Sequence, residues 1–166
     1  MKRTSFESMP CPLARALEHL SDSWNALILR EAFYGATRFD EFEAALGIAS
    51  NTLTRRLKDM TAGGLFERRL YSDKPPRYEY VLTQKGKDLR PVLLTLLEWG
   101  NKYSKPPGAS VHLVDTLTGT PVELALIDAV TGERIGGRHK VVGRSSGGKA
   151  MQSYPFPENS SLGPAL

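Results

Sequence analysis

Residues 44–80 read AALGIASNTLTRRLKDMTAGGLFERRLYSDKPPRYEY, and this stretch decides the fold. It begins with the pattern of a short helix and a tight glycine turn, and a second, basic helix is predicted over residues 50–62. A pair of glycines ends that helix, because glycine readily takes the left-handed conformation that a helix terminus needs. Alternating β-forming residues over 65–71 and 78–82 are joined by the polar segment 72–77, which predicts a β-hairpin.

The two helices of this stretch should each have a packed side and an outward side. Apolar side chains are spaced so that they bury one side of a two-helix unit, and they are Leu46, Ile48, Leu53, Leu57 and Met60. Polar side chains are left facing outward on the second helix, and they are Ser50, Asn51, Thr54, Arg55 and Lys58. Ser50 is predicted as the N-cap of that helix. This order of elements is typical of an α+β winged helix-turn-helix, which places one helix in the DNA major groove and a β-ribbon beside it.

Basic residues outnumber acidic ones over residues 55–77, by seven to three. The whole chain carries a net charge of +4 and has a pI of about 9.3, so an affinity for polyanions is expected. A basic run alone is more often a solvated surface, but here it coincides with the motif order, which favours double-stranded DNA as the partner. The candidate DNA-contacting residues are Arg38, Ser50, Asn51, Thr52, Thr54, Arg55, Arg56, Lys58, Lys74 and Arg77.

The chain has 166 residues, which suits one domain of ordinary size or a domain of about 100 residues with an appended module. No run of 18 apolar residues is present and the N-terminus lacks a signal-peptide pattern, so we expect no membrane segment and a cytoplasmic location. The single cysteine, Cys11, excludes an intramolecular disulfide and a metal site built from several cysteines. The sequence has no phosphate-binding loop and no H-E-x-x-H helix, so an enzyme is not expected.

Two helices are predicted before the central stretch, over 12–20 and 24–34, and the short helix with which the stretch begins is predicted over 38–46. After the stretch, a helix is predicted from a cap at 83–86 to about Tyr103. In the helix over 24–34 the expected apolar face consists of Trp24, Leu27, Ile28 and Ala32. The last helix has an apolar stripe made of Leu89, Val92, Leu93, Leu96, Leu97 and Trp99. Because this stripe is wider than one winged unit needs, we expect the first and last helices to form a homodimer. The alternative is that the last helix folds back on its own domain.

The C-terminal part of the chain has a different composition. We expect a DNA-binding and dimerisation domain over 1–104, a small β-hairpin module over 105–142 and a tail rich in Gly, Ser and Pro over 143–166. The pattern D-x-x-T-G occurs twice in the module, at 115–119 and 128–132, thirteen residues apart. Because β-forming residues flank both copies, two similar hairpins are predicted.

A family resemblance extends from Cys11 to about Tyr103. The residues that carry it are Cys11-Pro12, Trp24 with Ile28 to Glu31, Arg38 to Phe42, Leu53 to Leu57, Gly64-Leu65, Pro75 to Tyr80, Leu82-Thr83, Gly86, Pro91 to Leu93 and Trp99-Gly100. On these residues the chain closely resembles the HxlR family of bacterial transcription regulators, which are relatives of the MarR type. The resemblance implies a homodimeric winged helix that binds an inverted-repeat operator, often to repress a nearby gene. One departure is Ser21-Asp22-Ser23, where the family usually has glycines and a lysine.

A different class of function stays open beside this one. Some winged helices contact proteins or RNA without operator specificity. Such modules do not need both an outward polar face on the second helix of the motif and basic residues on the hairpin, and this chain has both.

The repeated D-x-x-T-G also resembles the C-terminal extension of some family members, in which C-x-x-C-G knuckles hold zinc. The corresponding residues here are Asp115, Thr118, Asp128 and Thr131, which do not supply the thiolate or imidazole ligands of a structural zinc site. We therefore expect no metal and no cofactor, and instead hydrogen bonds from Asp and Thr within the turns. The alternative is a metal held by His112 or His139 together with Asp115 or Asp128.

Cys11 precedes the first predicted helix, and a helix N-terminus favours the thiolate form of cysteine. Some members of the resembling family sense oxidants or electrophiles through this cysteine, which makes Cys11 a candidate redox sensor. The alternative is a cysteine packed as a small apolar side chain. A small-molecule effector is a further candidate partner. Trp24, Phe33, Tyr34 and Trp99 could line its pocket, although aromatic residues at helical spacing more often belong to a core.

Overall fold

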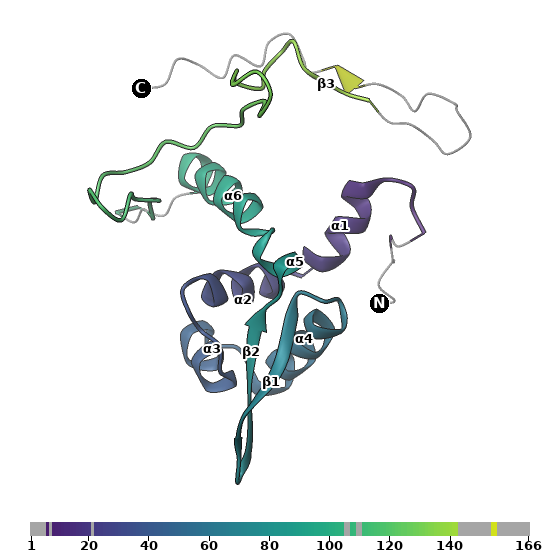
Figure 1. Cartoon of the computed structure of the whole chain (residues 1–166), viewed down its shortest axis with the longest axis vertical. Coiled ribbons are helices and arrows are strands. Elements are labelled where there is room, and N and C mark those ends of the chain that lie inside the picture. The colour runs from purple at the N-terminus through teal and green to yellow at the C-terminus, as the bar shows by residue number, and fades with distance from the viewer. Residues whose placement is uncertain are drawn as a thin grey trace. The chain divides into compact units, whose positions relative to one another are not determined.

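The computed structural model describes residues 6, 8–20, 22–104, 107–108, 111–142 and 154–155. It divides into two compact units, unit 1 over Met1–Val111 and unit 2 over His112–Leu166. Unit 1 contains helices α1 to α6 and strands β1 and β2, while unit 2 contains strands β3 and β4 (Figure 1). Unit 1 has the α+β architecture of a winged helix-turn-helix.

The four helices predicted up to residue 62 are confirmed, with small changes at their ends. Their bounds are Pro12–Leu20 for α1, Ser23–Phe33 for α2, Phe39–Leu46 for α3 and Ser50–Ala62 for α4. Proline at the first position of α1 fits a helix start, where its missing N–H costs no hydrogen bond. The Asp22 carboxylate caps α2 by accepting a hydrogen bond from the Trp24 N–H at 2.9 Å. The tight turn between α3 and α4 has Gly47 in the left-handed conformation, with φ of 59°.

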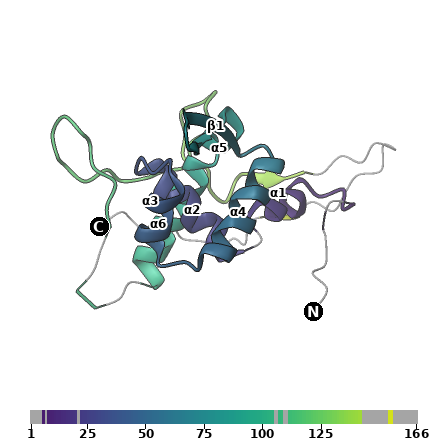
Figure 2. The same cartoon turned by 90° about the horizontal axis from the view of Figure 1, so that it is seen from below.

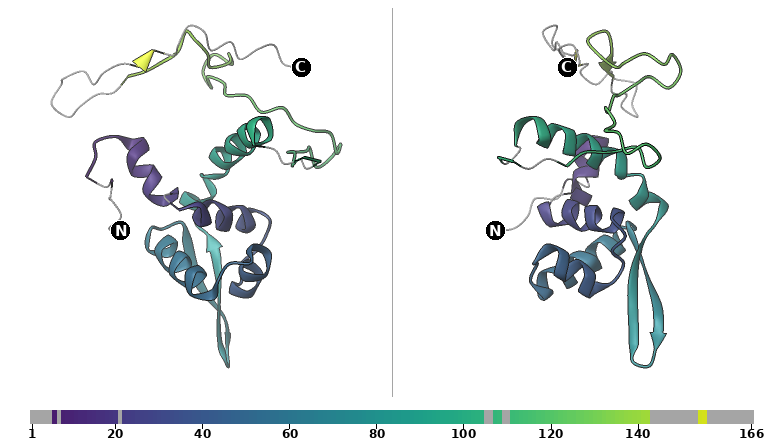
Figure 3. Two further views of the ribbon diagram at one scale, coloured as in Figure 1. Left: turned by 180° about the vertical axis from the view of Figure 1, so that it is seen from behind. Right: turned by 90° about the vertical axis from the view of Figure 1, so that its left-hand side faces the viewer.

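The predicted β-hairpin is confirmed and is longer than expected. Strand β1 covers Phe66–Asp73 and pairs in antiparallel register with β2, Pro76–Leu82. The hairpin projects well beyond the helices in two perpendicular views (Figures 1 and 3). At its base, the Tyr80 N–H donates to the Thr37 carbonyl at 2.6 Å and Arg38 forms a bridge with Glu79. The segment before α3 is therefore joined to β2 by an isolated bridge, beside the two-stranded sheet.

The single helix predicted from residue 83 to Tyr103 is wrong, because the chain forms two helices here. They are α5, Gln84–Lys87, and α6, Arg90–Tyr103. Thr83 caps α5 as predicted, since its hydroxyl accepts a hydrogen bond from the Gly86 N–H at 3.1 Å. The break comes from Pro91 in the first turn of α6. Proline has no N–H to donate, and its ring collides with the carbonyl four residues earlier, so a continuous helix cannot pass through this point.

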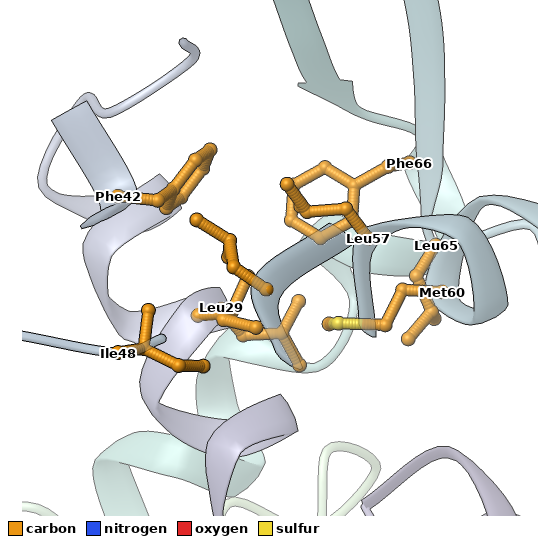
Figure 4. Close-up of a cluster of buried hydrophobic side chains, with 9 residues drawn as sticks. Leu29, Phe42, Ile48, Leu57, Met60, Leu65 and Phe66 are labelled. Atoms are coloured by element: carbon orange, nitrogen blue, oxygen red, sulfur yellow. The ribbon is translucent and has the colours of Figure 1, made fainter. Parts of the chain in front are cut away.

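The core of unit 1 joins α2, α3 and α4 to the start of β1 (Figure 4). Its buried side chains are Ile28, Leu29, Phe42, Ile48, Leu53, Leu57, Met60, Leu65 and Phe66. The Phe42 and Phe66 rings meet edge to face with centroids 6.2 Å apart. This confirms the buried positions predicted on α4 and in the preceding turn, whereas Leu46 is only partly buried.

The apolar face predicted for α2 is only partly correct. Ile28 is buried, but its buried companions are Asn25 and Leu29, while Leu27 and Trp24 are only partly covered. The physical reason is that α2 contacts α1, α3, α4 and α6, so it is covered on more than one side. A helix surrounded in this way does not show its orientation in a single apolar stripe.

Where the repeated pattern predicts two similar hairpins, unit 2 contains two similar turns without extended strands. Isolated bridges join Val114 to Pro121 and Ile127 to Arg134 on either side of them. In the first turn the Asp115 carboxylate accepts hydrogen bonds from the Leu117 and Thr118 N–H groups at 2.8 and 3.0 Å. The second turn repeats this arrangement: Asp128 accepts from the Val130 N–H at 2.9 Å and from the Thr131 hydroxyl at 3.0 Å. The hydrogen bonds predicted for Asp and Thr are therefore present.

These hydrogen bonds change the acidity of both carboxyl groups. The pKa of Asp115 is lowered, mainly by the hydrogen bond from the Thr118 N–H and next by that from Leu117. The pKa of Asp128 is lowered mainly by the hydrogen bond from the Val130 N–H.

Strands β3, Lys140–Val141, and β4, Tyr154–Pro155, pair in antiparallel register. Apart from β4, the predicted tail over 143–166 lies outside the described residues.

Gly86 gives a sharp test of the packing between α5 and the hairpin. A Cβ at this position would lie 2.3 Å from the Leu65 carbonyl oxygen and 2.9 Å from Leu82 Cδ2. We expect Gly86→Ala to lower the free energy of unfolding by about 1–3 kcal/mol, because the backbone must shift to admit the methyl group. Gly100→Ala is the control, since a Cβ there meets nothing within 4 Å and alanine favours a helix. Equal urea midpoints for wild type and Gly86→Ala would contradict this packing.

Candidate nucleic-acid interface

The outward face of α4 is polar and lies opposite its buried residues. Asn51, Thr54, Arg55 and Lys58 are exposed, whereas Leu53, Leu57 and Met60 pack into the core. Among the described residues, no ion pair involves Arg55 or Lys58, so both cations are available to an external partner. We call Asn51, Thr54, Arg55 and Lys58 the α4 face.

The prediction that Ser50 caps α4 is wrong. The N-cap is Ala49, which has extended backbone angles and no side chain that could accept a hydrogen bond. Ser50 is instead the first residue of the helix, and its exposed hydroxyl donates to the Glu43 carboxylate on α3. The N-terminus of α4 therefore has no side-chain cap, a feature that leaves N–H groups in its first turn available to an anion.

Arg56, one of the candidate DNA-contacting residues, is mostly covered. The side chain is only 12% exposed, and its guanidinium pairs with the Asp22 carboxylate at the start of α2. Position 56 is three residues after Leu53 and four before Met60, which places it toward the packed side of the helix. Thr52, four residues before Arg56, is half-buried as well. These two residues do not belong to the α4 face.

The tip of the hairpin carries the two basic residues that the sequence assigns to it. Lys74 in the terminal turn and Arg77 near the start of β2 are exposed, and within the described part of the chain neither has an acidic partner. The other wing arginines are engaged. Arg69 pairs with Glu67 at 2.9 Å, and the Arg68 guanidinium lies 3.4 Å from the centroid of the Tyr78 ring.

Arg38 lies between α3 and the wing. Its guanidinium is 4.7 Å from the centroid of the Tyr71 ring, and the backbone N–H of Arg38 donates to the Glu41 carboxylate at 2.9 Å. The same carboxylate accepts from the Thr37 N–H at 2.8 Å. The pKa of Glu41 is lowered, first by the Thr37 hydrogen bond and then by that from Arg38. Arg38 is thus exposed but held at a defined place beside β1.

The sequence analysis did not identify Tyr71 and Tyr78, whose rings lie beside the guanidinium groups of Arg38 and Arg68, respectively. Arg68 is opposite Tyr80 in the hairpin register, so Tyr78 is its diagonal neighbour on the partner strand. Diagonal neighbours are within reach of long and aromatic side chains. The register of the hairpin could therefore have indicated the Arg68–Tyr78 contact, whereas the Arg38–Tyr71 contact depends on the isolated bridge between Arg38 and Glu79 and had no local signal.

Helices α1 and α6 expose apolar side chains in unusual number. They are Leu13 and Leu17 on α1 and Val92, Leu96, Trp99 and Tyr103 on α6, with exposed fractions of 45–69%. Neither helix contains a fully buried residue. Leu89 and Leu93 pack against the core, so the predicted stripe divides into an inner part that folds back and an outer part that does not.

The predicted sensor residues are placed as follows. Cys11 is half-buried in the N-cap position of α1, where its carbonyl accepts a hydrogen bond from the Arg15 N–H at 3.1 Å. Of the aromatic residues predicted for an effector pocket, Trp24 and Phe33 pack against the core, whereas Tyr34 and Trp99 are exposed.

Within the described residues, no helix combines the length and the apolar character needed to cross a membrane. No group of three or more His, Cys, Asp or Glu side chains among them is arranged to hold a metal ion.

Comparison with known proteins places this geometry in a wider context. The model of the HxlR-like helix-turn-helix family matches residues 19–107. A protein of Mycobacterium tuberculosis named as an uncharacterised HTH-type transcriptional regulator is 40% identical over 128 residues, which cover 76% of this chain and 81% of that protein. About three quarters of the present chain is therefore similar in sequence to a protein named as a regulator.

Two solved structures are also similar. The crystal structure of PA1607, a candidate transcription factor, matches with a TM-score of 0.76 and 36% identity over 86% of this chain and 100% of that chain. This share exceeds unit 1, which ends at residue 111 of 166, so the similarity extends into unit 2. The redox regulator HypR in its reduced form matches with a TM-score of 0.54 and 30% identity over 57% of this chain and 95% of that chain.

Proposed function

The chain belongs to the HxlR-like helix-turn-helix family of transcriptional regulators, and we propose that it binds an inverted-repeat operator as a homodimer and represses transcription there. The observation that carries the proposal is the α4 face: an exposed row of polar and cationic side chains on a helix whose other side is fixed in the core. Repression is the outcome that the family resemblance implies.

The α4 face has the chemistry for reading bases in the major groove. An exposed guanidinium such as that of Arg55 can donate two hydrogen bonds to guanine, and the Asn51 amide can do the same with adenine. The N-terminal N–H groups of α4, which no side chain caps, suit a phosphate. The wing complements this face, because Lys74 and Arg77 at its tip are free to meet the phosphate backbone or the minor groove.

A homodimer would cover the exposed apolar side chains of α1 and α6. Covering them removes apolar surface from water and so favours association. A two-fold axis through this region would also give two copies of the α4 face, and half-sites about 34 Å apart suit such a pair. The same symmetry in the protein explains why an inverted repeat is the expected operator.

Cys11 is the proposed point of regulation. HypR, one of the structural neighbours, is named as a redox regulator. In the present chain Cys11 begins α1, one of the two helices proposed for the dimer, so modification of its sulfur would act on the interface between subunits. With no second cysteine, oxidation would link two subunits or trap a small thiol. A small-molecule effector is the alternative signal, and it would act through the same helices.

The first prediction concerns specificity. Arg55→Ala should weaken binding to the operator by about 5- to 150-fold, because a bidentate contact with guanine is worth roughly 1–3 kcal/mol. Arg77→Ala is the contrasting variant, and it should weaken binding to operator and random duplexes by similar factors. Affinities measured by titration at matched salt, with the operator taken from a footprint on genomic fragments, decide between them. A wild-type chain that prefers no duplex over another would instead support the protein or RNA interaction module.

The second prediction concerns assembly. The purified chain, of 18.3 kDa, should sediment as a species of two chains, and Leu96→Glu should convert it to a monomer by placing a charge in the apolar interface. Tyr34→Glu is the control, because Tyr34 is also exposed but lies outside α1 and α6. Circular dichroism should be unchanged in both variants. A monomeric wild type, or a dimeric Leu96→Glu, would exclude these helices as the interface.

The third prediction concerns the thiol. Treatment with hypochlorite or diamide should change the operator affinity of the wild type but not that of Cys11→Ser, because the thiol is the site of modification. The comparison needs both proteins folded, which their urea unfolding curves establish. An unchanged wild-type affinity, or an equal change in Cys11→Ser, would leave Cys11 as a packing residue.

A further inference from the structure

We propose that the ion pair between Asp22 and Arg56 positions α4 for DNA, so that an acidic residue supports binding to a polyanion. The inference rests on the proposed function, but it assigns a role to two residues that do not lie on the α4 face. Asp22 belongs to the segment in which this chain departs from the family pattern, and it was not among the residues predicted to act in binding.

The Asp22 carboxylate contacts both the backbone of α2 and the side chain of Arg56. One oxygen, Oδ1, accepts the hydrogen bond from the Trp24 N–H that caps α2, and the other, Oδ2, pairs with Arg56 Nη2. The Asp22 side chain is 28% exposed and the Arg56 side chain is 12% exposed, so the pair is partly removed from water. An ion pair of this kind is directional, in contrast to the apolar contacts of Leu53, Leu57 and Met60.

Arg56 depends on this partner. Its Nε atom is buried without a hydrogen-bond partner among the described residues, and no second carboxylate is paired with its guanidinium there. Removing the charge of Asp22 would therefore leave a largely buried cation uncompensated. Such pairs contribute little net stability compared with apolar residues, and their better supported role is to fix one arrangement of packed elements.

A second neighbour of α4 lies farther along its axis. The His19 ring, at the end of α1, lies beside Gly63, where an added Cβ would be 3.3 Å from His19 Nδ1. The His19 carbonyl in turn accepts a hydrogen bond from the side chain of buried Asn25 at 2.9 Å. Arg56 and Gly63 are seven residues apart, or about 10 Å along a helix. The junction of α1 and α2 therefore lies close to α4 at two points, of which the ion pair is the directional one.

The arrangement in space agrees with this role. Helix α4 lies beside α2 in the two perpendicular views, and contacts join the two helices (Figures 1 and 2). A small rotation of α4 about its axis would move Asn51, Arg55 and Lys58 away from the base edges that they would read. Binding groups displaced by about 1 Å can lose much of their effect, so a residue that prevents the rotation acts on specificity without touching DNA.

The sign of the effect separates this role from ordinary charge effects. Loss of an acidic group normally strengthens binding to DNA, because repulsion of phosphate is removed. We expect Asp22→Asn to do the opposite and weaken operator binding by about tenfold, with a smaller loss on random duplex. Asparagine keeps the N-cap of α2, so the substitution removes the ion pair and leaves the cap. Asp59→Asn is the matched control, since Asp59 is exposed on α4 with no ion pair in the described residues.

The experiment measures the affinity of the full chain for operator and random duplexes at several salt concentrations. Wild type, Asp22→Asn, Asp59→Asn, Arg56→Lys and Arg56→Met are compared well below their unfolding temperatures. Arg56→Met should lose operator affinity with an unchanged slope of log affinity against log salt, because Arg56 makes no phosphate contact. Arg56→Lys, which keeps a cation beside Asp22, should recover part of the loss.

Two results would overturn the inference while leaving the proposed function intact. The first is an Asp22→Asn chain that binds the operator as tightly as wild type or more tightly, as Asp59→Asn should. The second is a salt slope lowered by about 1 in Arg56→Met, which would show that Arg56 meets a phosphate directly. A wild-type chain without any preferred duplex would overturn the proposed function, and this inference with it.

Discussion

Burial of one side of α4 is the constraint on which the rest of unit 1 depends. Leu53, Leu57 and Met60 pack against side chains from α2, α3 and β1, and this burial supplies the main favourable free energy for folding the unit. Because one side of the helix is fixed in this way, the other side must face outward. The polar residues of the α4 face are therefore presented as a consequence of packing, and the wing, which continues from the same core through Leu65 and Phe66, is oriented by the same contacts.

The packing and the polar contacts of α4 have different effects. Apolar contacts fix how deeply the helix is buried, whereas the Asp22–Arg56 pair is directional and is the contact that we propose to restrict its rotation. This pair, and the His19 ring beside Gly63, reach α4 from the junction between α1 and α2. The helix proposed to read DNA is thus connected to a helix proposed for dimerisation by a few side chains, and a displacement of α1 would be felt directly at α4.

Most of unit 1 could be predicted from the sequence because its signals are local. Helix periodicity, the glycines after α3 and α4 and the alternation in the hairpin each depend on neighbouring residues. The predictions failed where distant residues decide the outcome. The spacing of Arg56 from Leu53 and Met60 places it toward the packed side of α4, but its partner Asp22 is 34 residues away and has no local signal. Leu29 replaces Leu27 in the core because α2 is covered on several sides. The break before α6 was readable in principle, since Pro91 forbids a continuous helix.

The two similar turns of unit 2 use carboxylate oxygens as hydrogen-bond acceptors. A thiol in the same place would be sensitive to oxidants. The carboxylates of Asp115 and Asp128 accept the turn hydrogen bonds, and no thiol takes part. Both pKa values are lowered in the folded state, so the contribution of these carboxylates is present above their unfolded pKa and is lost only as the pH falls through the lowered values. The hydrogen bonds to these carboxylates are therefore insensitive to oxidants that convert thiols, and acid well below neutral pH is the condition that weakens them. Thiol chemistry in this chain is confined to one atom, the sulfur of Cys11, at the other end of the sequence.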